Sequence, residues 1–331
     1  MSTPSLFSRW LASRPPSAAL EIGPRRVTGA VVSEQAGSFV VSSFATEPLP
    51  AGAVEPALNA TNVHDPSALA AAIKVTLDKL TPRPRRVALV LPDTVAKVSL
   101  LSFEKIPSKA QDLEQLIRWQ IRKAAPFKIE DAQIAWIPGA ALPGGGREFV
   151  VTVARRDVIS SYERACEAAG AHAGIVDLAS LNLVNAVLAM GSDGASPGAG
   201  PAPSADWMLV HVAPDYGTLA VVRGGTLIFF RHRASDSDAE LADLVHQTAM
   251  YHEDRLGGGG FSRVVLAGAS SRGLEPAERL RRELEARVGS HVETLDFRGR
   301  VALRDRITAG QDLVDSLGPS VGVLLRERVA S

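Results

Sequence analysis

The chain has 331 residues, of which 46% are hydrophobic and 22% charged, and its 36 lysines and arginines equal its 36 aspartates and glutamates. This length suffices for two lobes with buried cores, and the balanced charge argues against a nucleic-acid-binding surface. A single cysteine, Cys166, excludes an intramolecular disulfide and a cysteine-based zinc cluster. No apolar run approaches the roughly 18–20 residues that span a bilayer, and Arg9 and Arg14 interrupt the apolar residues near the N-terminus. We therefore expect a soluble, cytoplasmic protein.

The first predicted elements are a tail and a meander of strands. Residues 1–16 carry a short amphipathic stretch, which is either a hook for a membrane or partner or a frayed terminus. Apolar runs separated by turn residues then predict three antiparallel strands, at Ala19–Ile22, Val27–Ser33 and Ser38–Phe44. A helix follows near Pro66–Leu80.

Strands and helices alternate through the middle of the chain. The clearest helix begins at Ser108, where Gln111 completes a capping box, and Pro126 ends it. Its polar face carries Arg118 and Arg122, which are either solvated or contact a partner. The other elements expected here are strands at 86–92, 96–103, 131–137, 148–154 and 173–177, and helices near 157–169 and 180–190.

A linker separates this part from a second meander. Residues 191–205 are rich in Gly, Ser, Ala and Pro and cannot bury a core, which predicts a flexible linker. The later elements are strands at 207–212, 218–223, 226–231, 263–267 and 292–295, and helices near 236–256, 275–288 and 318–328. A meander followed by helices in each half predicts two lobes with a cleft between them.

Two hairpins, one in each half, have the pattern of a phosphate clamp. In residues 19–32 an apolar run leads to Glu21 and Gly23, a basic bend follows, and a second apolar run returns. Residues 208–222 form a looser copy of the same pattern. Two facing hairpins of this kind are typical of the nucleotide cleft of actin-like proteins.

The middle of the chain carries the most specific pattern. It includes Glu104–Pro107 before the capped helix, Ile121–Phe127 at its end, Val151–Val158, and Ile175–Ala179. In this order the stretches resemble the PilM family, actin-like cytoplasmic proteins of the type IV pilus assembly platform that are related to FtsA. The resemblance extends from Leu20 to Arg328.

The resemblance implies an α/β fold, namely the two-lobed actin-like ATPase (ribonuclease H-like) fold with an FtsA/PilM-type subdomain inserted in the first lobe. The boundaries that we expect are residues 1–16 for an N-terminal tail, 17–86 plus 171–190 for the first lobe, 87–170 for the inserted subdomain, 191–205 for the linker and 206–331 for the second lobe.

The resemblance also implies a binding role at the inner membrane. We expect a cytoplasmic adaptor of the pilus platform that binds the N-terminal cytoplasmic peptide of a PilN-like membrane protein, with Arg118 and Arg122 as polar contacts. Pilus motor ATPases, the platform protein and a ring of identical copies are further partners that the family implies. The alternatives are a nucleotide-dependent actin-like ATPase and the related cytoplasmic component of a type II secretion system.

The residues of the clamp decide between adaptor and ATPase. An actin-type ATPase needs an acid in each hairpin and one in the linking strand–helix region to hold Mg²⁺ through water, and backbone amides to hold phosphates. Glu21 keeps one of the acids, on a side chain one methylene longer than that of aspartate, while Pro24 removes a backbone donor. The other two acidic positions hold Ala179 and His211, although Asp215 lies near the latter.

We therefore expect no ATP hydrolysis, no catalytic residue and no metal site, and leave weak binding of ATP with Mg²⁺ open. The residues of such a vestigial nucleotide site are Glu21, Gly23, Arg25, Arg26, Asp215, Gly217 and Gly268.

No other motif in the chain indicates chemistry. His246 and His252 are six residues apart on a predicted helix, so they do not share a face as paired metal ligands would, and we expect surface histidines. Cys166 lies within a predicted helix with no nearby base, and we expect an inert side chain.

Overall fold

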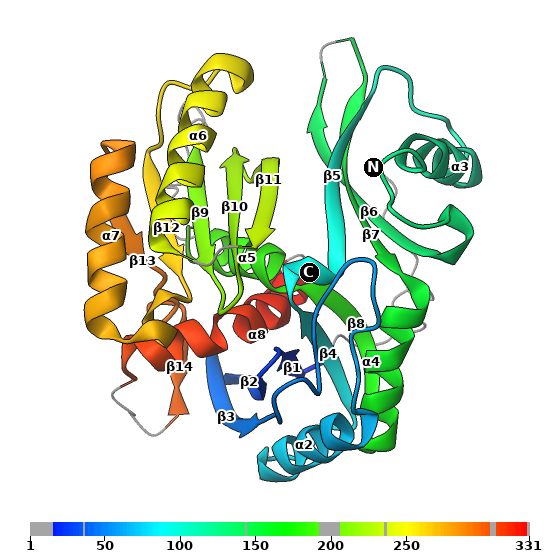
Figure 1. Cartoon of the computed structure of the whole chain (residues 1–331), viewed down its shortest axis with the longest axis vertical. Helices are drawn as coiled ribbons and strands as arrows, with labels where there is room; N and C mark the ends of the chain where they lie inside the picture. Colours follow the sequence, from blue (N-terminus) through cyan, green and yellow to red (C-terminus); the bar gives the residue numbers. More distant parts are fainter. Residues whose placement is uncertain are drawn as a thin grey trace.

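A computed structural model of the chain describes residues 16–35, 37–142, 144–191, 206–234, 237–304 and 309–329. The predicted tail and linker lie outside these residues, apart from Pro16 and Gly191. Within the described ranges, no helix is both long enough and apolar enough to cross a membrane. The elements form three sheets with helices packed on and between them (Figure 1).

The first lobe is built on a six-stranded sheet. Its strands, in spatial order, are β14 (Val301–Leu303), β3 (Ser38–Pro48), β2 (Arg26–Gln35), β1 (Ala18–Ile22), β4 (Arg86–Leu91) and β8 (His172–Leu178). The first three strands of the chain form the predicted antiparallel meander, whereas β4 and β8 run parallel to β1. After Arg86, β4 is apolar and buried on both faces, as expected for a central parallel strand.

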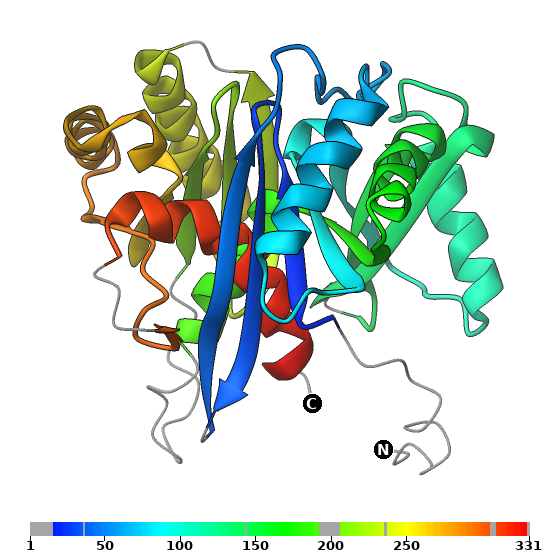
Figure 2. The same ribbon diagram turned by 90° about the horizontal axis from the view of Figure 1, so that it is seen from below.

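Helices cover both faces of this sheet. On one face, α2 (Pro66–Lys79) and α4 (Arg156–Ala168) contribute large buried side chains such as Ile73 and Tyr162. On the other face lies α8 (Gln311–Val329), and Figure 2 shows α2 and α8 on opposite sides of the meander. Cys166, a residue of α4, is buried in this core, as expected for an inert thiol.

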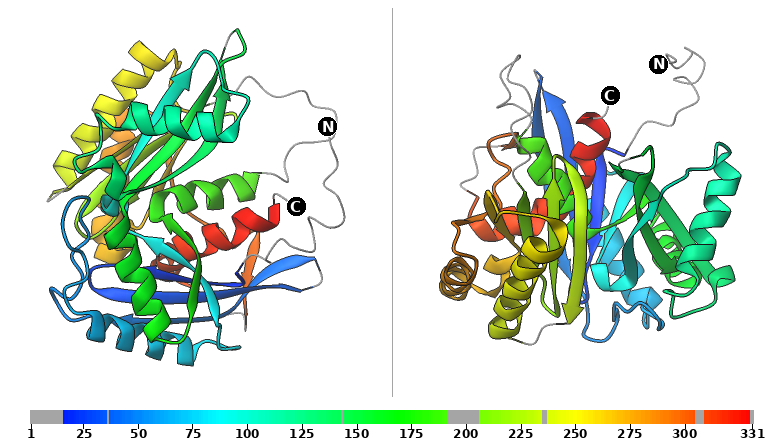
Figure 3. Two further views of the ribbon diagram at one scale, coloured as in Figure 1. Left: turned by 90° about the vertical axis from the view of Figure 1, so that its right-hand side faces the viewer. Right: turned by 90° about the horizontal axis from the view of Figure 1, so that it is seen from above.

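The second lobe repeats the arrangement with a five-stranded sheet. Its strands, in spatial order, are β11 (Thr226–Ala234), β10 (Tyr216–Arg223), β9 (Trp207–Val212), β12 (Arg263–Ala267) and β13 (Val292–Thr294). Helices α6 (Asp238–Leu256) and α7 (Leu274–Val288) pack on one face, and α5 (Ala179–Gly191) packs on the other. Helices α5 and α8 lie side by side between the two large sheets (Figure 3).

A third, smaller sheet stands beside the second lobe. It consists of β5 (Ala96–Phe103), β7 (Arg147–Arg155) and β6 (Ala132–Ala141), in that spatial order. Residues alternate along β7, so that Phe149 and Val151 face α3 (Ala110–Ile121), whereas Val150 packs toward α5. Figure 1 shows α3 on the outer side of this sheet.

The sheet assignments differ from the predicted boundaries. We expected the inserted subdomain to begin at residue 87, but β4 pairs with β1 and α4 packs against α2, so both belong with the first lobe. Likewise, β14 and α8 return from the second half of the chain to the first sheet. Pairing between distant segments decides these assignments, and a local pattern does not contain that information.

Two predicted helix starts are wrong. Helix α3 begins at Ala110 with Lys109 as its N-cap, and no side chain caps it, so the predicted capping box at Ser108 and Gln111 does not form. Helix α8 begins at Gln311 and runs through Pro319, although we expected a start at Gly318. The packing of α8 on β1, β2 and α5 outweighs the local preference for a break at proline.

Candidate functional site

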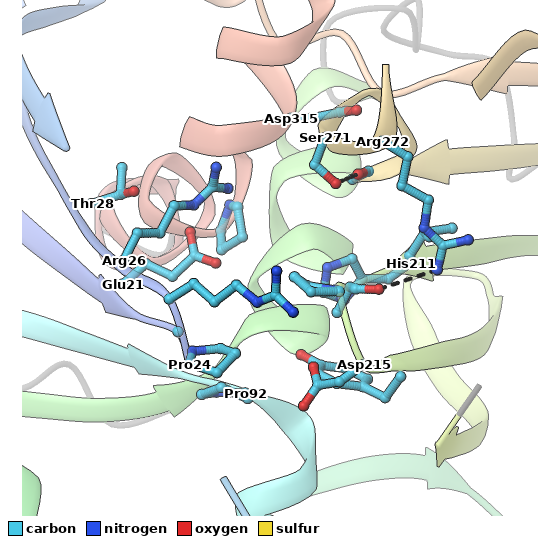
Figure 4. A pocket seen from close by; sticks show the side chains of 18 residues that line it. Glu21, Pro24, Arg26, Thr28, Pro92, His211, Asp215, Ser271, Arg272 and Asp315 are labelled. Carbon is cyan, nitrogen blue, oxygen red and sulfur yellow. Dashed lines mark hydrogen bonds between the residues drawn. The ribbon is translucent and has the colours of Figure 1, made fainter. Parts of the chain in front are cut away.

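The two hairpins face each other across a cleft between the lobes. The cleft has a volume of about 380 Å³. Figure 4 shows Glu21 and Arg26 on one side and His211 and Asp215 on the other. Of the seven residues predicted for a vestigial nucleotide site, the cleft brings together Glu21, Gly23, Arg25, Arg26, Asp215 and Gly268. Gly217 is not among the lining residues, and it packs instead under Leu241.

The turns of the two hairpins have the same hydrogen bond. The amide of Gly23 donates to the carbonyl of Arg26 at 3.0 Å, and the amide of Ala213 donates to that of Tyr216 at 2.9 Å. The next position in each turn is a proline, Pro24 or Pro214, which has no amide proton. Each turn therefore offers a phosphate fewer backbone donors than a glycine- or serine-rich turn would.

A buried aspartate that our sequence analysis did not single out lies behind the cleft. Asp93 follows β4 directly and is fully buried. Its carboxylate accepts hydrogen bonds from the amide of Ser180 at 3.0 Å, from the hydroxyl of Ser180, and from Thr218 Oγ1 at 2.6 Å. Its own amide donates to the Tyr216 hydroxyl at 3.2 Å. An acid placed directly after an apolar strand was the signal available in the sequence.

His211 completes this interlobe network, which consists of Asp93, Ser180, His211, Tyr216 and Thr218. Its Nδ1 lies 2.8 Å from Ser180 Oγ. Because the serine gives its single proton to Asp93, the histidine Nδ1–H must donate to the serine oxygen. In a nucleophilic triad the histidine lies between serine and acid, so this order is not that of a hydrolase. The network instead ties the first lobe to β9 and β10 of the second.

Burial and hydrogen bonding move the pKa values of the two acids in opposite directions. Burial would raise the pKa of Asp93, but the hydrogen bond and charge of His211, with Ser180 and Thr218, hold it below its ordinary value. Burial raises the pKa of Glu21, and nearby Arg26 only partly offsets this. One oxygen of Glu21 is buried without a hydrogen-bond partner. Asp93 is therefore committed to the network, whereas burial disfavours the charged form of Glu21.

The remaining acids do not supply a metal site either. Burial raises the pKa of Asp215, Asp315 accepts hydrogen bonds from the amide and hydroxyl of Ser270, and Asp177 on β8 forms an ion pair with Arg326 away from the cleft. The part of the chain that the structure describes holds no group of three or more His, Cys, Asp or Glu side chains that could bind a metal ion. The donors of the cleft therefore do not fit Mg²⁺ bound with a nucleotide.

Gly268 has a structural reason to be glycine. Its φ is +82°, and a Cβ there would lie 2.3 Å from the carbonyl oxygen of Val212. Close packing of β12 against the end of β9 therefore favours glycine at this position.

A second concavity lies between the first lobe and the small sheet. Two adjoining cavities of about 260 and 530 Å³ share four lining residues, Ala135, Thr152, Val176 and Asp177. We call the two together the β6–β8 groove. Both β6 and β8 are edge strands of their sheets, so the groove runs between two strand edges.

The larger half of the groove is mainly apolar. Helix α5 contributes Leu181, Val184 and Leu188, and Ile137 of β6 lines it with 60% of its surface exposed. The Asp177–Arg326 ion pair joins β8 to α8 at this half. Apolar side chains beside unpaired strand edges are the features that bind an extended peptide.

The predicted partner contacts lie elsewhere. Helix α3 packs Ile117 and Ile121 on the face of the small sheet opposite the α5 side. Arg118 forms an ion pair with Glu114 at 2.9 Å, and Arg122 is an exposed residue at the end of the helix. Neither arginine lines the cavities of the groove.

One predicted surface histidine is buried. His252 has no exposed surface, its Nε2 bonds to Asp206, and its ring stacks on Phe261 at 4.4 Å between centroids. The helix pattern could not reveal this because Asp206 lies 46 positions earlier in the chain. His252 is a core residue that fixes the start of β9.

Comparison with solved structures supports the architecture. The PilM–PilN type IV pilus biogenesis complex aligns over 96% of this chain and 99% of that chain, with a TM-score of 0.78 and 19% identity. A Bacteroides thetaiotaomicron protein with an actin-like ATPase fold and the cytoplasmic domain of EpsL from the Vibrio cholerae type II secretion system align with TM-scores of 0.49 and 0.47, both at 11% identity. They cover 88% and 95% of this chain, and 94% of their own chains.

A search of curated proteins finds no match. Residues 19–254 match the family model described as type IV pilus assembly protein PilM. This match includes both hairpins, the interlobe network and the small sheet, and it spans more than half of the chain. The chain belongs to the PilM family of type IV pilus assembly proteins, and its fold is the two-lobed actin-like one.

Proposed function

We propose that this chain is a cytoplasmic adaptor of the type IV pilus inner-membrane platform, and that it binds the N-terminal cytoplasmic peptide of a PilN-like membrane protein in the β6–β8 groove. The observation that carries the proposal is the groove itself, an apolar channel between two edge strands. A peptide strand added there would pair with free backbone groups while its side chains enter the cavities. The similar PilM structure was solved with PilN.

We also propose that the adaptor does not hydrolyse ATP, and the residues of the cleft support this. Both turns contain proline, Asp93 is held in the interlobe network, and burial raises the pKa of Glu21. The chain would then reach the membrane through its partner. Contacts with a motor ATPase, the platform protein or further copies of the chain are extensions of this proposal.

Binding of a labelled partner peptide tests the proposal. Fluorescence anisotropy with a peptide copied from the cytoplasmic N-terminus of the PilN-like partner should show saturable binding. Ile137→Glu places a charge in the groove at an exposed position and should weaken binding at least tenfold. Ile106→Glu is the matched control, since Ile106 is 38% exposed and lines neither cavity of the groove.

The outcomes separate the adaptor from its alternatives. No saturable binding, or an equal loss for both glutamate variants, would contradict the groove assignment. Micromolar binding of ATP with Mg²⁺ in calorimetry would favour the ATPase. Binding of the cytoplasmic peptide of a type II secretion partner in place of the pilus partner would assign the chain to that system.

A further inference from the structure

The two halves of the β6–β8 groove differ in size and chemistry. The larger half accepts apolar side chains, as described above. The smaller half, of about 260 Å³, has several small residues on its walls, namely Ala96, Ala135, Ala154, Ala173 and Gly174. Small walls leave room for a long side chain or a chain end, because they fill little of the cavity themselves.

The charged lining residues distinguish the smaller half from the larger half more clearly than its size does. The charged residues that line it are Glu163 and Asp177. Asp177 forms its ion pair with Arg326, which lines only the larger half. Glu163 has no hydrogen bond or ion pair within the described part of the chain, and it is partly exposed. The smaller half therefore presents one unpaired negative charge and no cation on its walls.

The position of Glu163 is fixed by the fold. Helix α4 packs Val158, Tyr162 and Ala165 into the core of the first lobe. Ile159 and Glu163, one helical turn apart, point instead toward β8 and line the cavity together. The carboxylate thus lies on rigid structure beside the free edge of β8. Arg86, which packs against Gly174, does not line the cavity.

We propose that the smaller half of the groove is a subsite for a cationic group of the bound peptide, with Glu163 as its specificity-determining residue. This inference rests on the proposed function, because it assumes that a peptide occupies the groove. The cationic group is either the α-amine of the peptide or the side chain of a lysine or arginine. A peptide with the cation in the smaller half and apolar residues in the larger half would have one fixed direction along β8.

Matched variants on one helix test the subsite. With the labelled partner peptide, Glu163→Gln should weaken binding about three- to fivefold and Glu163→Lys at least about tenfold, as expected for a partly exposed ion pair and its reversal. Glu167→Lys is the control, since Glu167 is exposed on the same helix α4 and lines neither cavity. The affinity of the Glu167→Lys variant for the peptide should stay within about twofold of that of the wild type.

Modified peptides identify the cation. N-terminal acetylation tests the α-amine, and replacement of each lysine or arginine by glutamine tests the side chains. One of these changes should cost as much affinity as Glu163→Gln and should cause no further loss on that variant. If no modified peptide loses affinity, or if Glu163→Lys and Glu167→Lys bind alike, the subsite proposal is wrong while the adaptor function stands. If the wild-type chain binds no peptide at all, the adaptor function fails first.

Discussion

The cleft and the β6–β8 groove are both concave, yet their polar groups are used in opposite ways. Directly behind the cleft, Asp93 is fully buried and accepts hydrogen bonds from Ser180 and Thr218 across the lobes. In the groove, the strand edges of β6 and β8 face no neighbouring strand, and Ile137 is largely exposed. A site whose polar groups already bond to each other stabilises the fold, whereas a site with unpaired edges and exposed apolar surface is available to a partner. In this chain we therefore propose that the cleft acts mainly as structure, and that the groove is the binding site.

The largest effect that we expect comes from breaking the interlobe network. Asp93→Ala would leave the buried hydroxyls of Ser180 and Thr218 without their acceptor, and should lower the free energy of unfolding by about 3–5 kcal/mol. Denaturant titration measures this free energy of unfolding. Asp215→Asn is the control in the same cleft and should change stability by less than about 0.5 kcal/mol. Equal losses would show that the network has no special role.

The second largest effect should come from the Asp177–Arg326 ion pair of the groove. Arg326→Gln would leave Asp177, whose side chain is only 14% exposed, without its cation, and should cost about 1–3 kcal/mol of stability. Arg282→Gln removes a partner from an exposed pair on α7 and should cost less than about 1 kcal/mol. A comparable loss in both variants would contradict the distinction between the two pairs.

A smaller effect, of opposite sign, is expected at Glu21. Its pKa is raised above the ordinary 4.5 in the folded chain. Below pH 4.5 both folded and unfolded carboxyls are protonated; as the pH rises, the unfolded state ionises first and the folded state loses stability. Glu21→Gln should therefore stabilise the chain by about 1 kcal/mol at pH 7 and have little effect near pH 4. Thermal unfolding at the two pH values measures the difference, and destabilisation at pH 7 would show that the charged form is needed.

The sequence predicted the repeated parts of the fold better than the parts that join them. The two meanders and their turns follow from local patterns of apolar and turn residues, and they were found where expected. The return of β14 and α8 to the first sheet depends on pairing across the whole chain, so no local pattern predicts it. The helix α8 also crosses Pro319, which local preference alone would not allow.

The same limit applies to the sites. Glu21 and Gly23 were selected because a short motif contains them, and both line the cleft, whereas Gly217 of the second hairpin does not. Asp93 was missed because its partners, Ser180 and Thr218, are 87 and 125 positions away. Arg118 and Arg122 were selected from a polar helix face, and the fold places that helix across the small sheet from the α5 side. A polar face shows which residues are solvated, but only the assembled sheets show which surface is concave.

The smallest expected effect is the sharpest test of the contrast between cleft and groove. If the cleft is structural, adding ATP and Mg²⁺ should change the affinity for the partner peptide by less than about twofold, because a ligand shifts an equilibrium only through different affinities for its two states. The prediction is not trivial, since α5 carries both Ser180 of the network and Leu181 of the groove, so a nucleotide that opened the lobes would move the groove wall. Anisotropy titrations with and without nucleotide measure the ratio. A fivefold or larger change in affinity would mean that the cleft still binds nucleotide and that the effect of binding reaches the groove through α5. The hydrogen bonds of the interlobe network would then form a switch.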